Sequence, residues 1–125
     1  MNTLYESGEM YLETILLLKE QQDKVRSIDI VREMGFSKPS VSVGMKKLKE
    51  GGYINIDSEG YIFLTDAGLN TAKKIFERHT ILTQVLLNLG VSVETAQEDA
   101  CKIEHIISEE TFEKIKEYKK HQEEK

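Results

Sequence analysis

The sequence predicts a mainly α-helical protein with one short β-hairpin near its middle. Apolar residues recur at helical spacing through most of the chain, whereas two runs around residues 53–64 alternate and are rich in β-forming types. The length of 125 residues, 39% of them hydrophobic, suits one compact domain or a small domain with a helical extension.

The composition excludes several classes of protein. The longest aliphatic run, residues 15–18, is far shorter than the ~20 residues of a membrane span, and no secretory signal is recognisable at the N-terminus. A single cysteine, Cys101, excludes an internal disulfide framework and fits a reducing compartment. We therefore expect a cytoplasmic protein with no membrane partner.

The N-terminal part predicts three helices. Ser27 and Ser37 are placed to cap the second and third helices, Gly35 to end the second, and Pro39 is tolerated in a first helical turn. The expected helices cover residues 4–22, residues 28–34, and a stretch from Ser37 to near Gly51 and Gly52.

A β-hairpin follows, with strands at residues 53–56 and 61–64 joined by a turn at residues 57–60. Two short helices joined by a tight turn and followed by a hairpin predict a winged helix-turn-helix over residues 1–68 with a two-stranded wing. The wing offers only Asp57 and Glu59 as charged groups, so we expect any contact that it makes with DNA to be weak or through main-chain groups.

The third helix carries the predicted DNA contacts. The net charge of the chain is −5, but residues 37–49 hold four lysines and no acidic residue, and phosphate attraction is local under physiological screening. Small polar side chains at the start of this helix would reach base edges, and the lysines would contact phosphates. The alternative is that the serines only cap and the lysines only solvate the helix. The expected DNA-binding residues are Ser37, Lys38, Pro39, Ser40, Ser42, Lys46 and Lys47.

Three more helices are predicted after the wing, over residues 67–89, 93–107 and 109–120. Asp66 is expected to cap the first of them and Gly90 to end it. Their apolar stripes need more cover than a hairpin provides, so residues 69–125 predict a helical module that pairs with a second copy of the chain. The charged residues from position 119 onward are expected to fray.

Three side chains on the helix at residues 93–107 form a candidate metal site. Cys101, Glu104 and His105 stand at i, i+3 and i+4, so they converge on one helical face. A thiolate, a carboxylate and an imidazole are ligands for a divalent transition metal. The expected core stripe lies almost opposite and comprises Ala96, Ala100, Ile103, Ile106 and Ile107.

Two further residues lie where the helical pattern does not predict their type: an apolar residue off an apolar stripe and a histidine on one. Met10 points away from the apolar stripe of the first helix, beside Glu13, and its thioether is a candidate fourth ligand as well as a packing or dimer contact. His79 lies on the apolar side of its helix, where it is either a core histidine or a ligand of a second site.

At these residues the chain resembles the diphtheria-toxin-repressor and manganese-transport-regulator (DtxR/MntR) family of metal-dependent transcriptional repressors. The matching segments are E-M-Y-L-E-T-I at residues 9–15, S-K-P-S-V-S at 37–42, R-H at 78–79 and E-D-A-C-K-I-E-H at 98–105. The resemblance implies a winged helix followed by a helical dimerisation and metal-binding domain. It also implies a homodimeric repressor that binds double-stranded operator DNA when metal is plentiful.

The resemblance also implies which residues bind metal. Met10, Cys101, Glu104 and His105 match the primary site of the iron-responsive branch, and His79 and Glu13 match ligands of a second site. The sequence departs from that branch in two ways. An SH3-like domain is lacking, so a short form of the family is expected, and Thr83 and Gln97 stand where that branch has a carboxylate and a histidine as ancillary ligands.

The donor set bears on the metal. Soft sulfur donors favour Fe(II), Co(II), Ni(II) or Zn(II), whereas Mn(II) prefers oxygen. We therefore expect Fe(II) first and Mn(II) next as the effector, while Zn(II), Co(II) or Ni(II) would also bind in vitro.

Three other interpretations stay open. A metal-independent winged-helix regulator keeps the DNA-binding residues and makes Met10 and Cys101 incidental. A structural zinc site would hold the fold without regulating it. The last is a metalloenzyme or a cysteine hydrolase, in which Cys101 and His105 could pair as nucleophile and base. Nothing resembles an oxyanion hole or a Gly-rich substrate loop, so we expect neither an enzyme nor a small organic substrate.

Overall fold

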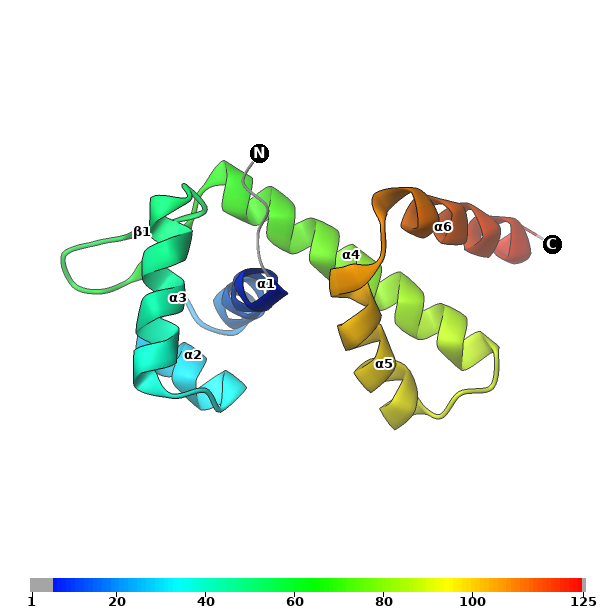
Figure 1. Cartoon of the computed structure of the whole chain (residues 1–125), viewed down its shortest axis with the longest axis horizontal. Helices are drawn as coiled ribbons and strands as arrows, with labels where there is room; N and C mark the ends of the chain where they lie inside the picture. The colour runs from blue at the N-terminus through cyan, green and yellow to red at the C-terminus, as the bar shows by residue number, and fades with distance from the viewer. Residues whose placement is uncertain (1–5, 125) are drawn as a thin grey trace. The chain divides into compact units, whose positions relative to one another are not determined.

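The computed structural model describes residues 6–124 and is mainly α-helical, as predicted (Figure 1). Contacts within the chain divide it into two compact units, the first ending at Lys73 and the second beginning at Lys74. The elements are α1 (Glu6–Gln21), α2 (Ser27–Met34), α3 (Lys38–Glu50), β1 (Ile54–Ile56), β2 (Ile62–Leu64), α4 (Asp66–Asn88), α5 (Val93–Ile106) and α6 (Glu109–Glu123).

Helix ends follow local chemistry, with two corrections. The Ser37 hydroxyl accepts from the Ser40 amide at 3.2 Å, which confirms the predicted cap of α3. Ser27 lies inside α2, whose N-cap is Arg26, and the Arg26 amide donates to the Asp29 carboxylate at 2.9 Å. The cap of α4 is Thr65 and not Asp66, which is the first residue of the helix. The Thr65 hydroxyl accepts from the Gly68 amide at 3.1 Å, and this amide is one of those at the start of the helix that have no partner within it.

The core of the first unit joins α1, α2, α3 and the hairpin. Its most deeply buried residues include Leu12, Ile15, Ile30, Met45, Leu48, Ile54 and Ile62. Burial of these side chains holds α3 with Val41, Met45 and Leu48 inward and its polar face outward.

One close approach positions α3 against α1. A Cβ atom added to Gly44 would lie 2.3 Å from Cε2 of Tyr11, whose ring is buried. The Tyr11 hydroxyl donates to the main-chain carbonyl of Ser40 at 3.4 Å, and its ring meets Phe36 edge-on with centroids 5.9 Å apart. Glycine in a helix interior is unfavourable, and here it is required by the contact with the Tyr11 ring.

The wing is an antiparallel pair in which Ile54 faces Leu64 and Ile56 faces Ile62. The Ile62 amide donates to the carbonyl of Val25 at 2.8 Å, so the segment between α1 and α2 is tied to β2. At the turn, the Asp57 carboxylate accepts from the amides of Glu59 and Tyr61, each at 2.9 Å.

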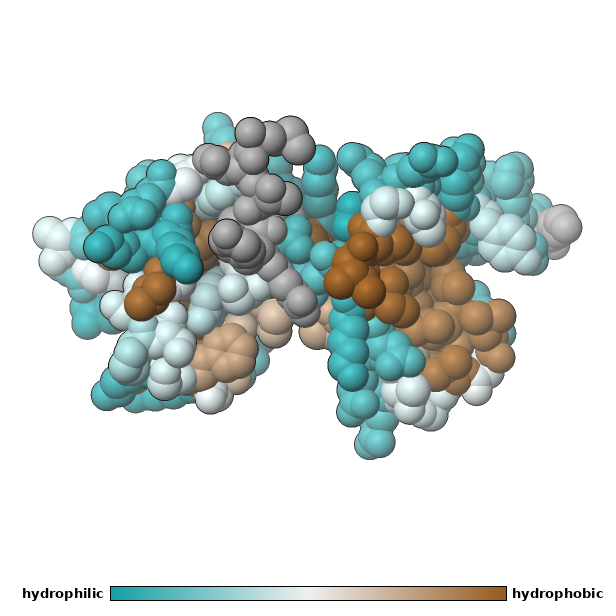
Figure 2. All heavy atoms as spheres, in the orientation of Figure 1, coloured by the Kyte–Doolittle hydropathy of each residue, from teal (hydrophilic) through white to brown (hydrophobic). Residues whose placement is uncertain are grey.

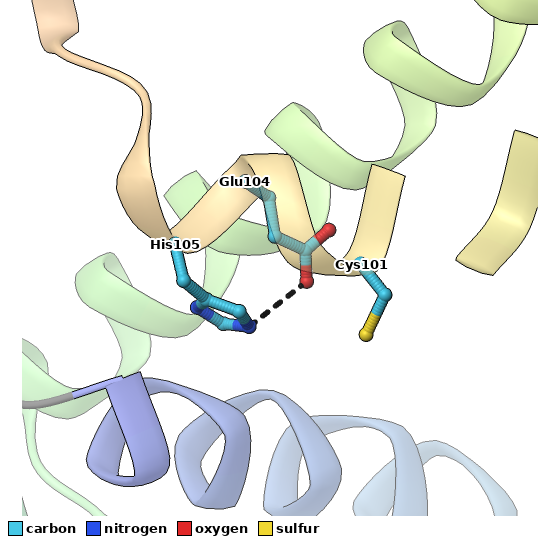
Figure 3. Close-up of side chains that lie close together, drawn as sticks. All are labelled: Cys101, Glu104 and His105. Atoms are coloured by element: carbon cyan, nitrogen blue, oxygen red, sulfur yellow. Dashed lines mark ion pairs between the residues drawn. The ribbon is translucent and has the colours of Figure 1, made fainter. Parts of the chain in front are cut away.

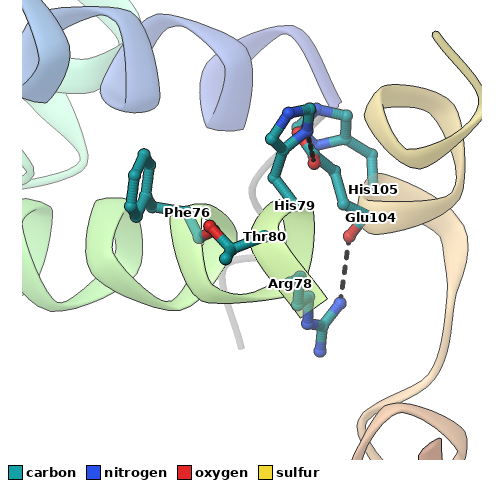
Figure 4. Close-up of polar contacts among 6 residues, drawn as sticks. All are labelled: Phe76, Arg78, His79, Thr80, Glu104 and His105. Atoms are coloured by element: carbon teal, nitrogen blue, oxygen red, sulfur yellow. Dashed lines mark hydrogen bonds and ion pairs between the residues drawn. The ribbon is translucent and has the colours of Figure 1, made fainter. Parts of the chain in front are cut away.

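The second unit packs the later part of α4 with α5 and α6. Its buried apolar residues are Ile75, Leu82, Ala96, Ala100 and Phe112. Arg78 connects these helices, because its Nη1 donates to the main-chain carbonyl of Glu104 at 3.1 Å (Figure 4). The same Nη1 donates to the carbonyl of Ile107 at 3.1 Å, and the guanidinium lies 5.4 Å from the centroid of the Phe112 ring.

The prediction that the charged residues from position 119 onward fray is wrong. Helix α6 continues to Glu123. An ion pair between Lys119 and Glu123, one helical turn apart, supports the last turn. In the part of the chain that the structure describes, no helix has the length and apolar character required to cross a bilayer.

Candidate functional site

The three predicted ligands on α5 do converge. One ligand atom each from Cys101, Glu104 and His105 lies within 4.8 Å of the others. Figure 3 shows the Glu104 carboxylate between the Cys101 sulfur and the His105 ring, with Oε1 of Glu104 3.3 Å from Nε2 of His105. The i, i+3, i+4 spacing on one helix produces this arrangement without help from loop geometry.

The predicted core stripe of α5 is wrong at two positions. Glu104 is completely buried, whereas Ile106, assigned to the core, is 76% exposed. Glu104 follows Ala96 and Ala100 at steps of four residues, and both of these alanines are buried. Positions i, i+4 and i+8 share a helical face, so the buried stripe continues onto the carboxylate.

A second histidine meets the same carboxylate. Nδ1 of His79, on α4, lies 2.8 Å from Oε2 of Glu104 (Figure 4). Burial alone would raise the pKa of the Glu104 carboxyl, but hydrogen bonds and positive charge from His105 and His79 outweigh burial and lower that pKa. Glu104 is therefore a buried anion with an imidazole at each oxygen.

The chemistry of this cluster fits a divalent cation. Buried charge is costly unless it is paired or coordinated, and the buried Oε1 of Glu104 faces Nε2 of His105 at 3.3 Å. Sulfur, carboxylate oxygen and imidazole nitrogen are together a ligand set for transition metals. The residues present on α4 and α5 thus suit a metal, with Glu104 placed to serve both the α5 ligands and His79.

The two other proposed ligands lie on α1, in the first unit. Met10 and Glu13 are both half-buried. Their role as ligands stays a prediction.

The recognition surface predicted from the sequence is exposed. All seven predicted DNA contacts on and before α3 face solvent, while the opposite side of the helix is buried. Ser37 does act as a cap, as the alternative interpretation of these serines expects. Its hydroxyl accepts from the Ser40 amide and also donates to the hydroxyl of Ser40 at 2.9 Å.

Sequence reasoning missed one residue on this face. Val43 is 55% exposed on α3 and lines a groove of about 590 Å³. An exposed valine places an apolar group at the surface of α3, and an apolar group of this kind can contact the methyl group that thymine presents in the major groove. The sequence contained the indication, because the spacing of the buried residues Val41, Met45 and Leu48 places Val43 outside the apolar stripe of α3. The groove is lined by Ser7, Tyr11, Phe36, Ser37, Pro39, Ser40, Val43, Gly44 and Lys47.

Two family models cover nearly the whole chain. The model described as "Iron dependent repressor, N-terminal DNA binding domain" matches residues 3–61. The model described as "Iron dependent repressor, metal binding and dimerisation domain" matches residues 65–125.

Individual relatives agree with these models. The chain is 35% identical to a helix-turn-helix-type transcriptional regulator of Methanocaldococcus jannaschii, over 89% of this chain and 90% of that protein. It is 38% identical to the transcriptional regulator MntR of Escherichia coli O6:H1, over 82% of this chain and 66% of that protein.

Solved structures share the fold. The structure of the manganese regulator SloR matches with a TM-score of 0.80 and 27% identity, over 94% of this chain and 54% of SloR. The chain thus spans only about half the length of that regulator. On the two domain models and these relatives together, the chain belongs to the iron-dependent repressor (DtxR/MntR) family of metal-dependent transcriptional regulators.

Proposed function

We propose that this chain is a homodimeric, metal-activated repressor that binds double-stranded operator DNA when it is loaded with a divalent metal. The observation that carries the proposal is the convergence of Cys101, Glu104 and His105 within 4.8 Å, in a chain that also exposes a basic recognition helix. Buried charges in proteins are paired or coordinate metals, and the side chains around this buried carboxylate are of the types that bind transition metals.

Cys101, Glu104 and His105 would hold the cation, with Met10 of α1 as the fourth ligand and with His79 and Glu13 at a second site. The donor set favours Fe(II) as effector and Mn(II) next, because the sulfur ligands are softer than the oxygens that Mn(II) prefers. Zn(II), Co(II) or Ni(II) would bind in vitro. The family models and the relatives between them name both iron and manganese, so the choice of Fe(II) rests on the ligands.

The first unit contains a route from Met10 to the DNA-reading helix. Tyr11 follows Met10 on α1, and its buried ring packs against Gly44 while its hydroxyl donates to the Ser40 carbonyl. When bound, the metal supplies coordination bonds that restrain the side chain of Met10. Tyr11 would then hold α3 in one position against α1, and metal and DNA would favour the same conformation, a coupling typically worth ~1–3 kcal/mol.

The second unit supplies a surface for the partner copy. Figure 2 shows hydrophobic side chains gathered over this unit, and its exposed apolar residues include Leu87, Leu89, Val93, Ile106 and Tyr118. Large exposed apolar surface is typical of an association face. Two recognition helices related by two-fold symmetry would then contact half-sites about one helical turn, ~34 Å, or a multiple of it apart.

Titration of DNA binding with metal tests the proposal. Duplexes selected from a random library by the Fe(II)-loaded protein should bind at least about tenfold more weakly when a chelator removes the metal, a coupling of ~1.4 kcal/mol. Cys101→Ala should keep the helical content but lose the metal response, whereas Lys102→Ala, a neighbouring exposed position, should keep both.

Equal affinity with metal and with chelator would support the metal-independent regulator instead. Unfolding on chelation, seen as a loss of helical circular dichroism, would indicate a structural zinc site. Either result contradicts the proposal.

A further inference from the structure

The outer face of β2 carries aromatic rings covered by cations. Tyr61 and Phe63 flank the buried Ile62 in sequence, and side chains alternate along a strand, so both rings lie on the side away from the core. Nζ of Lys24 lies 4.8 Å and Cζ of Arg26 lies 4.5 Å from the centroid of the Tyr61 ring. Nζ of Lys19 lies 4.4 Å from the centroid of the Phe63 ring.

The backbone holds these cations in place. Val25, between Lys24 and Arg26, is completely buried, and its carbonyl accepts from the Ile62 amide at 2.8 Å. With Val25 inward, the residues on either side of it are exposed. Two positive groups are therefore attached to the wing by a segment more than thirty residues earlier in the sequence.

Two acidic side chains of the neighbouring segments accept hydrogen bonds from main-chain amides. The Asp57 carboxylate accepts two amides of the wing turn, and Asp29 accepts the Arg26 amide rather than pairing with its guanidinium. Within residues 6–124, neither Lys24 nor Arg26 forms an ion pair with a carboxylate. Both cations lie close to the centroid of one ring, at 4.8 Å for Lys24 and 4.5 Å for Arg26, and an anion that contacts both would relieve their repulsion and gain charge-assisted hydrogen bonds.

We propose that Lys24 and Arg26, supported by the Tyr61 ring, form a phosphodiester-binding site through which the wing contacts the DNA backbone. This rests on the proposed DNA-binding function and revises the expectation that the wing contributes only weak or main-chain contacts. The site takes its charge from the segment between α1 and α2, because the wing turn itself carries only acidic groups. Such contacts position the protein on the duplex without reading its sequence.

The salt dependence of DNA binding tests the site. Each phosphate contact contributes about 0.9 to the slope of log affinity against log salt concentration on duplex DNA. The double variant Lys24→Gln/Arg26→Gln loses this one phosphate contact and should therefore lower the magnitude of the slope by about 0.9, equally on a selected duplex and on a random one. The matched control is Lys73→Gln/Lys74→Gln, which removes two exposed positive charges from α4 and should leave the slope near that of the unmodified chain.

The outcomes separate the two proposals. A slope that is the same in the Lys24/Arg26 variant as in the control overturns this site, even if the variant is less stable, because cations that only buttress the ring make no phosphate contact. A chain that binds neither duplex overturns the proposed function and this site with it. A chain that binds DNA with a slope reduced only by the Lys24/Arg26 change supports both.

Discussion

Nδ1 of His79 and Oε2 of Glu104 lie 2.8 Å apart, joining α4 to a carboxylate that is completely buried on α5. The other oxygen of the same carboxylate faces His105 at 3.3 Å. Glu104 is thus shared between two imidazoles, and it connects the α5 ligand set to the candidate second site at His79.

Glu104 makes the metal-free protein sensitive to acid. Its folded-state pKa lies below the ordinary value, so its contribution to stability is fully present above that ordinary value and is lost as the pH falls through the folded-state pKa. Glu104→Gln should lower the free energy of unfolding at neutral pH, and the difference from the unmodified chain should shrink as the solution is acidified. Urea denaturation in the presence of a chelator, at several pH values, measures this.

Glu98→Gln serves as the control for that experiment, since Glu98 is exposed on the same helix and should change stability little at any pH. Equal stability of the Glu104→Gln variant and the unmodified chain at neutral pH would show that the histidine contacts do not stabilise the carboxylate.

The identity of the residue at position 101 should set the metal preference. Cys101→Glu replaces a soft thiolate with a hard carboxylate on the same helical arc, so the ratio of Mn(II) to Co(II) affinity should rise by about tenfold or more. Competition titration with a metal-binding dye measures both affinities, with Co(II) as an air-stable substitute for Fe(II).

Cys101→Ser is the companion variant, because it replaces only the sulfur atom by oxygen. It therefore removes the soft donor without adding a charge. It should weaken Co(II) binding without improving Mn(II) binding. An unchanged affinity ratio in both variants would remove Cys101 from the site.

The close approach of Gly44 to Tyr11 should make Gly44→Ala destabilising, although alanine favours helices. The added methyl group would lie 2.3 Å from a carbon of a buried ring, and overpacking of this kind costs about 1–3 kcal/mol. Thermal or urea denaturation measures the loss, and Ser42→Ala, at an exposed position of the same helix, should cost far less.

A Tyr11→Leu background sharpens the Gly44 prediction. If the ring is the obstacle, Gly44→Ala should cost less in that background than in the unmodified chain. An equal cost in both backgrounds would place the requirement for glycine elsewhere.

The sequence by itself determined most of the local structure. The Ser37 cap, the end of α2 at Gly35 and the i, i+3, i+4 arc of Cys101, Glu104 and His105 all depend on residues within about one helical turn. Such signals are complete in a short stretch of chain, so they could be interpreted without knowing what packs against it. The family resemblance rested on the same stretches.

Only the tertiary structure decided which charged groups are buried and which share a partner. The helical wheel placed Glu104 on a polar face, but packing of α5 continued the Ala96 and Ala100 stripe onto it and brought His79 to its second oxygen. Likewise, Lys24 and Arg26 reach the Tyr61 ring only because the buried Val25 binds β2. The electrostatic environment of a charged group depends on whatever fills the space around it, and here that space is filled by residues about 25 to 37 positions away in sequence.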